Sequence, residues 1–302
     1  MIKLFPWKRT LHNKKVWFSL IVMLTFVLTS ILAPFIAPHD PYEQGIANFN
    51  LPPMWVQNKS PAGREEFVLG TDRFGRDVLS RLLYGTRTAL FLALTAVPIA
   101  ALIGTLVGLI TGYAGGRVDA FILFFTDIIN SLPGIMFLVI IVLIFRSLLI
   151  PTWSHGLFTL VIGFAAVSWV SLARLIRISV LQLKSQLFVD AAVGIGATPW
   201  RIITRHILPN VLHVTLVWII NNIPVIILLE VVLGYIGVGV TSAVDGREFT
   251  VVSWGGMFSS RLLALRHNPL MLIIPSLSIL LISMSFFLMG DFLNGITWQG
   301  QE

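Results

Sequence analysis

The chain has 302 residues, of which 56% are hydrophobic and 12% are charged, and its mean hydropathy is +0.87. Soluble globular domains carry about 25% charged residues, so this composition excludes that class. The absence of cysteine excludes disulfides and cysteine-ligated metal sites, and the net charge of +7 fits basic residues at cytoplasmic membrane edges better than nucleic-acid binding.

Six apolar stretches are long enough to cross a bilayer, for which a helix needs about 20 largely apolar residues. In chain order they cover residues 16–37, 89–112, 119–145, 157–172, 211–235 and 270–290. The fourth is expected to continue as a helix past Arg177. The sequence therefore predicts an all-α polytopic membrane protein with six transmembrane helices, without a sizeable soluble domain or an internal repeat.

The first stretch is either a signal peptide or an uncleaved anchor, because basic residues precede it: Lys3, Lys8, Arg9, Lys14 and Lys15. Signal peptides have an apolar core of about 7–15 residues followed by a small-residue cleavage site. This stretch is longer, and no Ala-x-Ala sequence follows it. We interpret it as an anchor.

The distribution of Lys and Arg sets the orientation, since cytoplasmic loops carry an excess of both. The segment between the fourth and fifth spans has one acid, Asp190, against five basic residues: Arg174, Arg177, Lys184, Arg201 and Arg205. The prediction is a cytoplasmic tail over 1–15, an external loop over 38–88, a five-helix core over 89–290 with a cytoplasmic loop over 174–210, and a cytoplasmic tail over 291–302.

Two patterns describe the second span and the residues before it. Apolar residues at helical spacing, interrupted by Arg81 and Arg87, predict a helix that either lies in the membrane interface or packs on its own protein. Within the span, small residues recur every four positions and form a flat face for close helix packing, either in this chain or with a partner: Ala96, Ala100, Gly104, Gly108 and Gly112. The glycine-rich run 112–116 is then expected to end the span in a tight turn.

Polar groups inside apolar spans are the candidates for a translocation pathway. Asp127 lies in the third span and Glu230 in the fifth, where Asn221, Asn222 and Pro224 form a polar, kink-prone middle. Charged groups at membrane depth usually face a bundle interior or a water-filled path. They act in transport or fix helix packing, and an ion-coupled carrier would use them too.

The segment from Asp190 to Pro209 is the most informative part of the chain. Thr198 suits a helix N-cap and Pro199 the first helical position, while Gly194 and Gly196 separate this helix from the preceding one. Pro209 is expected to end the short helix or to begin the fifth span after a break. A helix, a glycine turn and a short basic helix form either a docking site for a soluble partner or a plain connection.

This segment resembles the coupling motif of binding-protein-dependent ABC importers, Glu-Ala-Ala-x3-Gly-x9-Ile-x-Leu-Pro. The matching positions are Asp190 (in place of Glu), Ala191, Ala192, Gly196, Leu208 and Pro209. His206 departs from the general pattern, although Arg-His-Ile-Leu-Pro is similar to the form of the peptide branch. The resemblance implies that these residues, with Thr198 and Arg201, contact a separate ATPase.

Other segments resemble one permease subunit of dipeptide and oligopeptide importers. They are 69–81 (LGTDRFGRDVLSR), 112–119 (GYAGGRVD), the region of Asp127, Glu230, and 253–257 (SWGGM). The loop 241–252, with Asp245, Arg247 and Glu248, is longer and more polar than the family pattern. Nearly the whole chain is covered, which implies a type I ABC importer permease in a bacterial or archaeal cytoplasmic membrane.

The resemblance implies a set of partners, the location of the ATP, and a class of cargo. A homologous second permease, two ATP-binding subunits and an external binding protein are expected, together with membrane lipid and without nucleic acid. The chain lacks the Gly-x4-Gly-Lys-Ser/Thr phosphate loop, so ATP and Mg²⁺ are expected only in the partner ATPases and no cofactor or metal on this chain. Peptides are the expected cargo, with nickel or metal chelates, glutathione and oligosaccharides as alternatives.

Two other classes of protein compete with this interpretation. An ion-coupled secondary transporter or channel would use Asp127 and Glu230 directly and would work without ATP or partners. An intramembrane enzyme would need a motif such as His-Glu-x-x-His or Ser-x-x-Lys, and the chain has neither. The sequence therefore predicts a transport subunit, not an enzyme.

Overall fold

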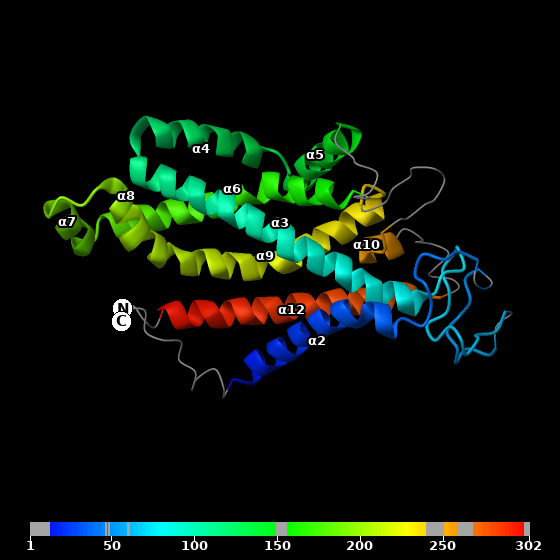
Figure 1. The fold of residues 1–302 in the computed structure, drawn as a ribbon. Coiled ribbons are helices and arrows are strands. Elements are labelled where there is room, and N and C mark those ends of the chain that lie inside the picture. Colours follow the sequence, from blue (N-terminus) through cyan, green and yellow to red (C-terminus); the bar gives the residue numbers. More distant parts are fainter. Residues whose placement is uncertain are drawn as a thin grey trace.

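The computed structural model describes residues 13–45, 47, 49–58, 61–148, 156–239, 251–258 and 268–298. Among these residues it contains helices and loops, with an isolated antiparallel bridge between Thr71 and Asp77 and no strand. The helices run lengthwise in an elongated bundle (Figure 1). The predicted all-α class is confirmed. The polar loop residues 241–250, residues 1–12 of the predicted N-terminal tail and residues 299–302 of the predicted C-terminal tail lie outside the described residues.

Five helices in the described part of the chain are long and apolar enough to cross a membrane, and the bent pair α4–α5 adds a sixth span if its two helices count as one. The elements are α2 (Lys14–Ile36), α3 (Val78–Ala114), α4 (Gly116–Ser131), α5 (Gly134–Leu148), α6 (Leu157–Lys184), α7 (Leu187–Gly194), α8 (Pro199–Ile202), the π-helical turn η2 (Ile203–Ile207), α9 (Leu208–Ile236), α10 (Trp254–Met257) and α12 (Leu270–Trp298). Helix α12 extends to Trp298, so residues 291–298, which were predicted as part of the tail, are helical instead.

Helix α3 includes both the helix expected before the second span and the span over 89–112 itself. It is one helix of 37 residues, and the Asp77 side chain caps it by accepting a hydrogen bond from the Ser80 N–H. Val78, Ser80 and Arg81 in its first turn are buried. The segment predicted as an interfacial helix therefore packs on its own protein, and the external loop ends at Asp77 rather than at residue 88.

The third predicted span is not one straight helix. Helices α4 and α5 meet at an angle of 94° across a short break. Leu132 ends α4 in an extended conformation because Pro133 follows, and proline disfavours helical geometry in the residue before it. The pair therefore runs along the bundle and then turns sharply.

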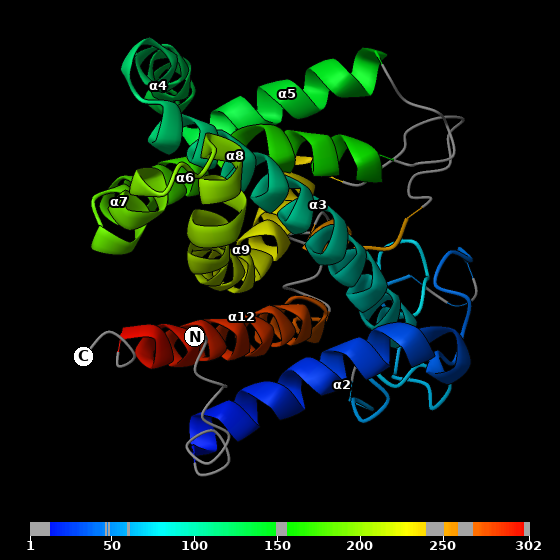
Figure 2. The ribbon, with the colours of Figure 1, turned by 60° about the vertical axis from the view of Figure 1, so that its left-hand side comes forward.

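Helices α3 and α6 pack closely through the small-residue face of α3. A Cβ added to Gly104 would lie 2.7 Å from the Trp169 carbonyl oxygen, and one added to Gly108 would lie 2.6 Å from that of Ala173. Gly112 is equally tight, since its Cβ would lie 2.6 Å from the Val180 Cβ. In the structure this face packs within the chain, against α6. Figure 2 shows α3, α6 and α9 together, with α12 and α2 as a second layer.

The two ends of the bundle differ. Helices α7 and α8 lie at one end, toward which α2 begins and α12 finishes, and α10 with the loop over 38–77 lies at the other (Figure 1). Helix α3 ends at the first of these two ends, where Gly115 and Gly116 have φ angles of 64° and 56°. This is the predicted glycine turn, and it places α4 back against α3 and α6.

Candidate functional site

Helices α7 and α8 form a compact knob, residues 187–207, between the end of α6 and the start of α9. Its inner side is apolar and buried through Val189, Ala192, Ile202 and Ile207, which join the main hydrophobic core. Only Ser185 and Gln186 separate α6 from α7, and α8 continues through η2 into α9. The knob is therefore attached firmly to two long helices.

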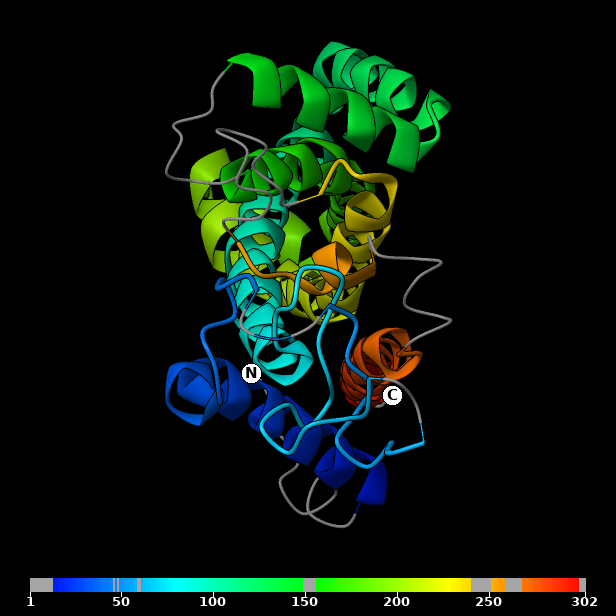
Figure 3. The same cartoon turned by 90° about the vertical axis from the view of Figure 1, so that its right-hand side faces the viewer.

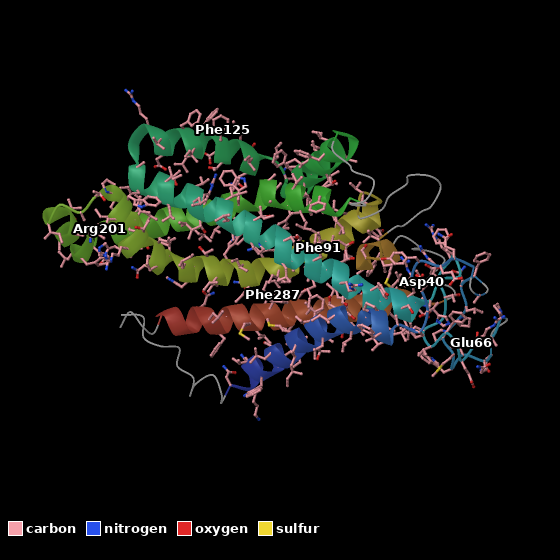
Figure 4. The ribbon with its side chains drawn as sticks, viewed as in Figure 1. Asp40, Glu66, Phe91, Phe125, Arg201 and Phe287 are labelled. Atoms are coloured by element: carbon pink, nitrogen blue, oxygen red, sulfur yellow. The ribbon has the colours of Figure 1, made fainter. Side chains whose placement is uncertain are left out.

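The outer side of the knob exposes large apolar side chains. Ile195 is 87% exposed, Leu187 86% and Trp200 74%, with Phe188 and Val193 also exposed nearby. They lie at the extreme end of the bundle, in the region that Figure 4 marks with Arg201. Several large apolar side chains exposed on one short segment indicate a protein–protein contact.

The turn between α7 and α8 is a Schellman motif with a glycine at its left-handed position. The Gly196 N–H donates to the Val193 carbonyl at 2.9 Å and the Ala197 N–H to the Ala192 carbonyl at 3.0 Å. Gly196 has a φ of +84°, which side chains rarely adopt, whereas Gly194 has no positive φ. Gly196 therefore sets the angle at which α8 leaves α7.

The next helix begins as predicted. The Thr198 hydroxyl accepts a hydrogen bond from the Arg201 N–H at 3.4 Å, and Pro199 occupies the first turn of α8. Of the predicted coupling residues on the knob, those that are exposed lie together on it: Asp190, Ala191, Gly196, Thr198 and Arg201. Ala192 is buried beneath them and anchors α7.

The predicted break at Pro209 is absent. Residues Pro199–Ile236 run as one helix of 38 residues. The turn before the proline is π-helical, and the Leu208 N–H donates to the Ile203 carbonyl. This wider turn shifts the hydrogen-bonding register where Pro209 has no N–H to give, so the helix continues. Leu208 and Pro209 therefore lie in the first turn of α9, with no break before it.

The residues predicted to line a translocation pathway lie on different helices and do not face one common cavity. Asp127 lies on α4 and pairs with Arg174 of α6 at 2.6 Å, with 68% of its side chain exposed. Asp119 and Arg177 make a second pair between the same helices, with a hydrogen bond of 2.6 Å from the Arg177 Nε. Asp127 thus fixes α4 to α6. The sequence alone did not predict that Arg174, Arg177 and Asp119 also take part in the contact between α4 and α6.

The polar residues of α9 are engaged within the bundle. The Asn222 side chain donates to the Trp218 carbonyl at 2.8 Å, and Asn221 packs closely against Gly290 of α12. Glu230 is 3% exposed. None of these three lines the groove of about 640 Å³ that runs between α9 and α12, whose walls include Leu228, Ser276, Ser283, Phe287 and Asp291. Figure 4 labels Phe287 in this position.

Within the described part of the chain, no cluster of His, Cys, Asp or Glu side chains has the arrangement of a metal site. The strongest functional features are therefore the knob with its exposed apolar surface, the ion pairs between α4 and α6, and the buried Glu230.

Comparisons with known proteins identify the family of the chain. A family model described as the inner membrane component of binding-protein-dependent transport systems matches residues 104–296. A second model, the N-terminal TM domain of oligopeptide transport permease C, matches residues 3–53.

Several curated relatives match nearly the full chain. The dipeptide transport system permease protein DppC of Haemophilus influenzae is 34% identical over 280 residues, 93% of this chain and 88% of the relative. The oligopeptide transport system permease protein OppC of Bacillus subtilis is 31% identical over 279 residues, 92% and 83% of the two chains. The glutathione transport system permease protein GsiD of Pectobacterium atrosepticum is 29% identical over 285 residues, 94% and 87%.

A chain from the MetNI methionine ABC transporter, solved in inward-facing conformations, shares the fold. The TM-score is 0.53 at 17% identity, over 71% of this chain and 95% of that chain. The likeness supports the fold alone, whereas the family model covers more than half of the sequence. The chain therefore belongs to the family of binding-protein-dependent transport system inner membrane components, as a permease subunit of an ABC importer and not as an enzyme.

Proposed function

We propose that this chain forms, with a homologous second permease, the pathway by which an ATP-driven importer carries peptides that an external binding protein delivers. Relatives named for dipeptide and oligopeptide transport match more than nine-tenths of the chain, which supports peptides as the cargo class. A relative named for glutathione, itself a small peptide, is consistent with the same class.

The observation that carries the proposal is the knob. Its exposed apolar side chains Leu187, Ile195 and Trp200 lie on two short helices whose inner sides are part of the core. Burying such side chains against a partner is favourable by about 25 cal/mol per Å² of apolar surface. We assign this surface to contact with a partner ATPase, which holds the ATP and Mg²⁺ of the system.

The knob transmits movement because it is continuous with two long helices. A displacement of α7 reaches α6 across two residues, and a displacement of α8 reaches α9 without any break in the helix. Two ATPase chains that close on ATP would shift the equilibrium between two arrangements of these helices, because they bind the two arrangements with different affinities.

The orientation follows from this assignment. If the knob faces the ATPases, it lies in the cytoplasm, together with the start of α2 and the end of α12 (Figure 1). The loop over 38–77 and α10 then lie outside, where the binding protein arrives. The positive-inside distribution of Lys and Arg supports the same arrangement.

Uptake by the reconstituted importer tests the proposal. The chain, its second permease and both ATPases are placed in proteoliposomes with the binding protein, and uptake of a labelled dipeptide and a labelled tetrapeptide is measured. Uptake is expected only with ATP and binding protein together, and excess unlabelled peptide should compete where a nickel chelate or a trisaccharide does not. Transport by this chain alone, driven by an ion gradient, would contradict the proposal.

A further inference from the structure

A short turn at the end of the bundle opposite the knob joins helices that are distant in sequence. This outer clasp comprises residues 252–257 and includes α10, which lies across the ends of α3 and α9 (Figure 3). On the α3 side, the Thr88 hydroxyl donates to the Val252 carbonyl at 2.7 Å and the Trp254 Nε1–H donates to the Leu82 carbonyl at 3.1 Å. The clasp is therefore fixed to α3 by two hydrogen bonds.

The packing of the Trp254 side chain also anchors the clasp. It is 1% exposed, and its ring lies 6.2 Å from that of Phe26 on α2. A Cβ added to Gly85 would lie 2.7 Å from the Trp254 Nε1, so the indole occupies the space that a side chain at this position of α3 would need. The clasp therefore stays with α2 and α3 as one unit.

The contact with α9 is different, because it depends on one buried carboxylate. The Gly255 N–H donates to the Glu230 Oε2 at 3.1 Å, and the Ser253 side chain lies beside the same carboxylate. A Cβ added to Gly234 would lie 2.5 Å from the Gly255 Cα, so the two backbones touch without any intervening side chain. Glu230 thus ties the far part of α9 to the clasp.

Glu230 is poorly suited to a purely packing role. It is 3% exposed, and its Oε1 has no hydrogen-bond partner. The space beside it is a cavity of about 10 Å³ that is otherwise apolar, with walls that include Leu92, Leu160 and Phe164. A buried polar oxygen without a partner costs free energy, so an apolar side chain would pack there more favourably. The carboxylate instead serves the clasp, through the Gly255 N–H and the neighbouring Ser253 side chain, in a contact that is directional and leaves Oε1 unsatisfied.

Helix α9 contains a proline one to two turns before this contact. Pro224 lies inside the helix, six residues before Glu230, and has no N–H to donate to the preceding turn. Proline is a common cause of helix kinks. The part of α9 beyond Pro224 can therefore change its angle relative to the part that continues into the knob. It is held by core packing through residues such as Ile227 and Leu233 and, through Glu230, by the clasp.

We propose that Glu230 is a positioning residue that holds the outer part of α9 against α3 through the clasp, and that this contact releases and re-forms in each transport cycle as a latch on the outer mouth of the pathway. The inference rests on the proposed transport function. Glu230 then acts by tying helices together and not by touching the cargo.

Cysteine accessibility tests the latch, because the chain has no cysteine of its own. Met257 belongs to the clasp and is 1% exposed, so a Met257→Cys variant reports its opening. The assembled importer in lipid nanodiscs is treated with a maleimide under three conditions: at rest, with binding protein and ATP, and at rest with Glu230→Ala added. We expect slow labelling at rest and labelling at least about tenfold faster in both other conditions.

Two matched variants separate the latch from general loosening. Glu230→Gln keeps a carbonyl oxygen for the Gly255 N–H and should restore slow labelling at rest. Ile282→Ala removes buried apolar volume from α12 while leaving the clasp residues and Glu230 unchanged, and it should leave labelling slow. A Tyr235→Cys control, at a position that is 48% exposed, should react quickly throughout.

Equal labelling with and without Glu230→Ala, or equal acceleration by Ile282→Ala, overturns the tie between Glu230 and the clasp. If turnover does not change the labelling of Met257→Cys in nanodiscs, and the unmutated complex takes up peptides in the vesicle assay, the latch is overturned but the proposed function stands. Absence of peptide uptake by the unmutated complex contradicts the proposed function, whereas the comparison at rest still tests the tie.

Discussion

Replacing Gly196 with valine is expected to lower peptide uptake by about tenfold while the chain still inserts into the membrane. Gly196 has a φ of +84°, a conformation in which a β-branched residue is strongly disfavoured. Such strain costs about 1–3 kcal/mol, and about 1.4 kcal/mol already reduces the population of the native turn tenfold. Helix α8 then leaves α7 at another angle, and ATP hydrolysis proceeds without uptake. Parallel measurement of both rates in proteoliposomes checks this.

Gly194→Ala is the matched control. Gly194 is the last residue of α7, it has no positive φ, and an added Cβ would meet no atom within 4 Å. Uptake and hydrolysis should therefore stay coupled in this variant, since alanine favours the helix. Normal coupled uptake by Gly196→Val would show that the angle of the knob does not matter for coupling.

Gly108→Leu is expected to produce the largest loss of stability. A Cβ at this position would lie 2.6 Å from the Ala173 carbonyl oxygen and 2.7 Å from the Ile176 Cβ, so α3 and α6 must separate. Overpacking a core costs about 1–3 kcal/mol, and the cost is greater where the obstacle is backbone. We expect the melting temperature to fall by about 5 °C or more, given shifts of about 2–4 °C per kcal/mol in chains of comparable size.

Tryptophan fluorescence during heating of the detergent-solubilised chain provides the measurement, since the chain has nine tryptophans. Gly134→Ala is the control, because an added Cβ at the start of α5 would meet no atom within 4 Å. Its melting temperature should match that of the unmutated chain. A Gly108→Leu variant as stable as this control would mean that α3 and α6 do not pack through the small-residue face.

Features that depend on local sequence were predictable. The four-residue spacing of Gly104, Gly108 and Gly112 identified a close helix contact, because only small residues let two backbones approach. Thr198 and Pro199 gave the start of α8, since the cap and the first helical position select those residue types. In both cases the chemistry that determines the structure lies within one helix or one turn.

Features that depend on distant contacts were not predictable from spacing. Asp127 and Arg174 are 47 positions apart, and Glu230 and Gly255 are 25 apart, so their pairing depends on how whole helices pack. Pro133 was visible in the sequence, but the apolar residues on both sides of it concealed the bend between α4 and α5. The continuity of α9 past Pro209 likewise required the π-helical turn, for which the sequence has no clear signature.

Cross-linking from the knob tests the central claim most directly. Ile195 is the most exposed of the knob's apolar residues at 87%, and an Ile195→Cys variant has no competing thiol on this chain. In the assembled importer, a cysteine-reactive photocross-linker at this position is expected to capture the ATP-binding subunit, with a yield that changes when ATP is added. A cysteine that stays freely reactive toward maleimide in the assembled importer, and that captures no ATP-binding subunit, would contradict the account.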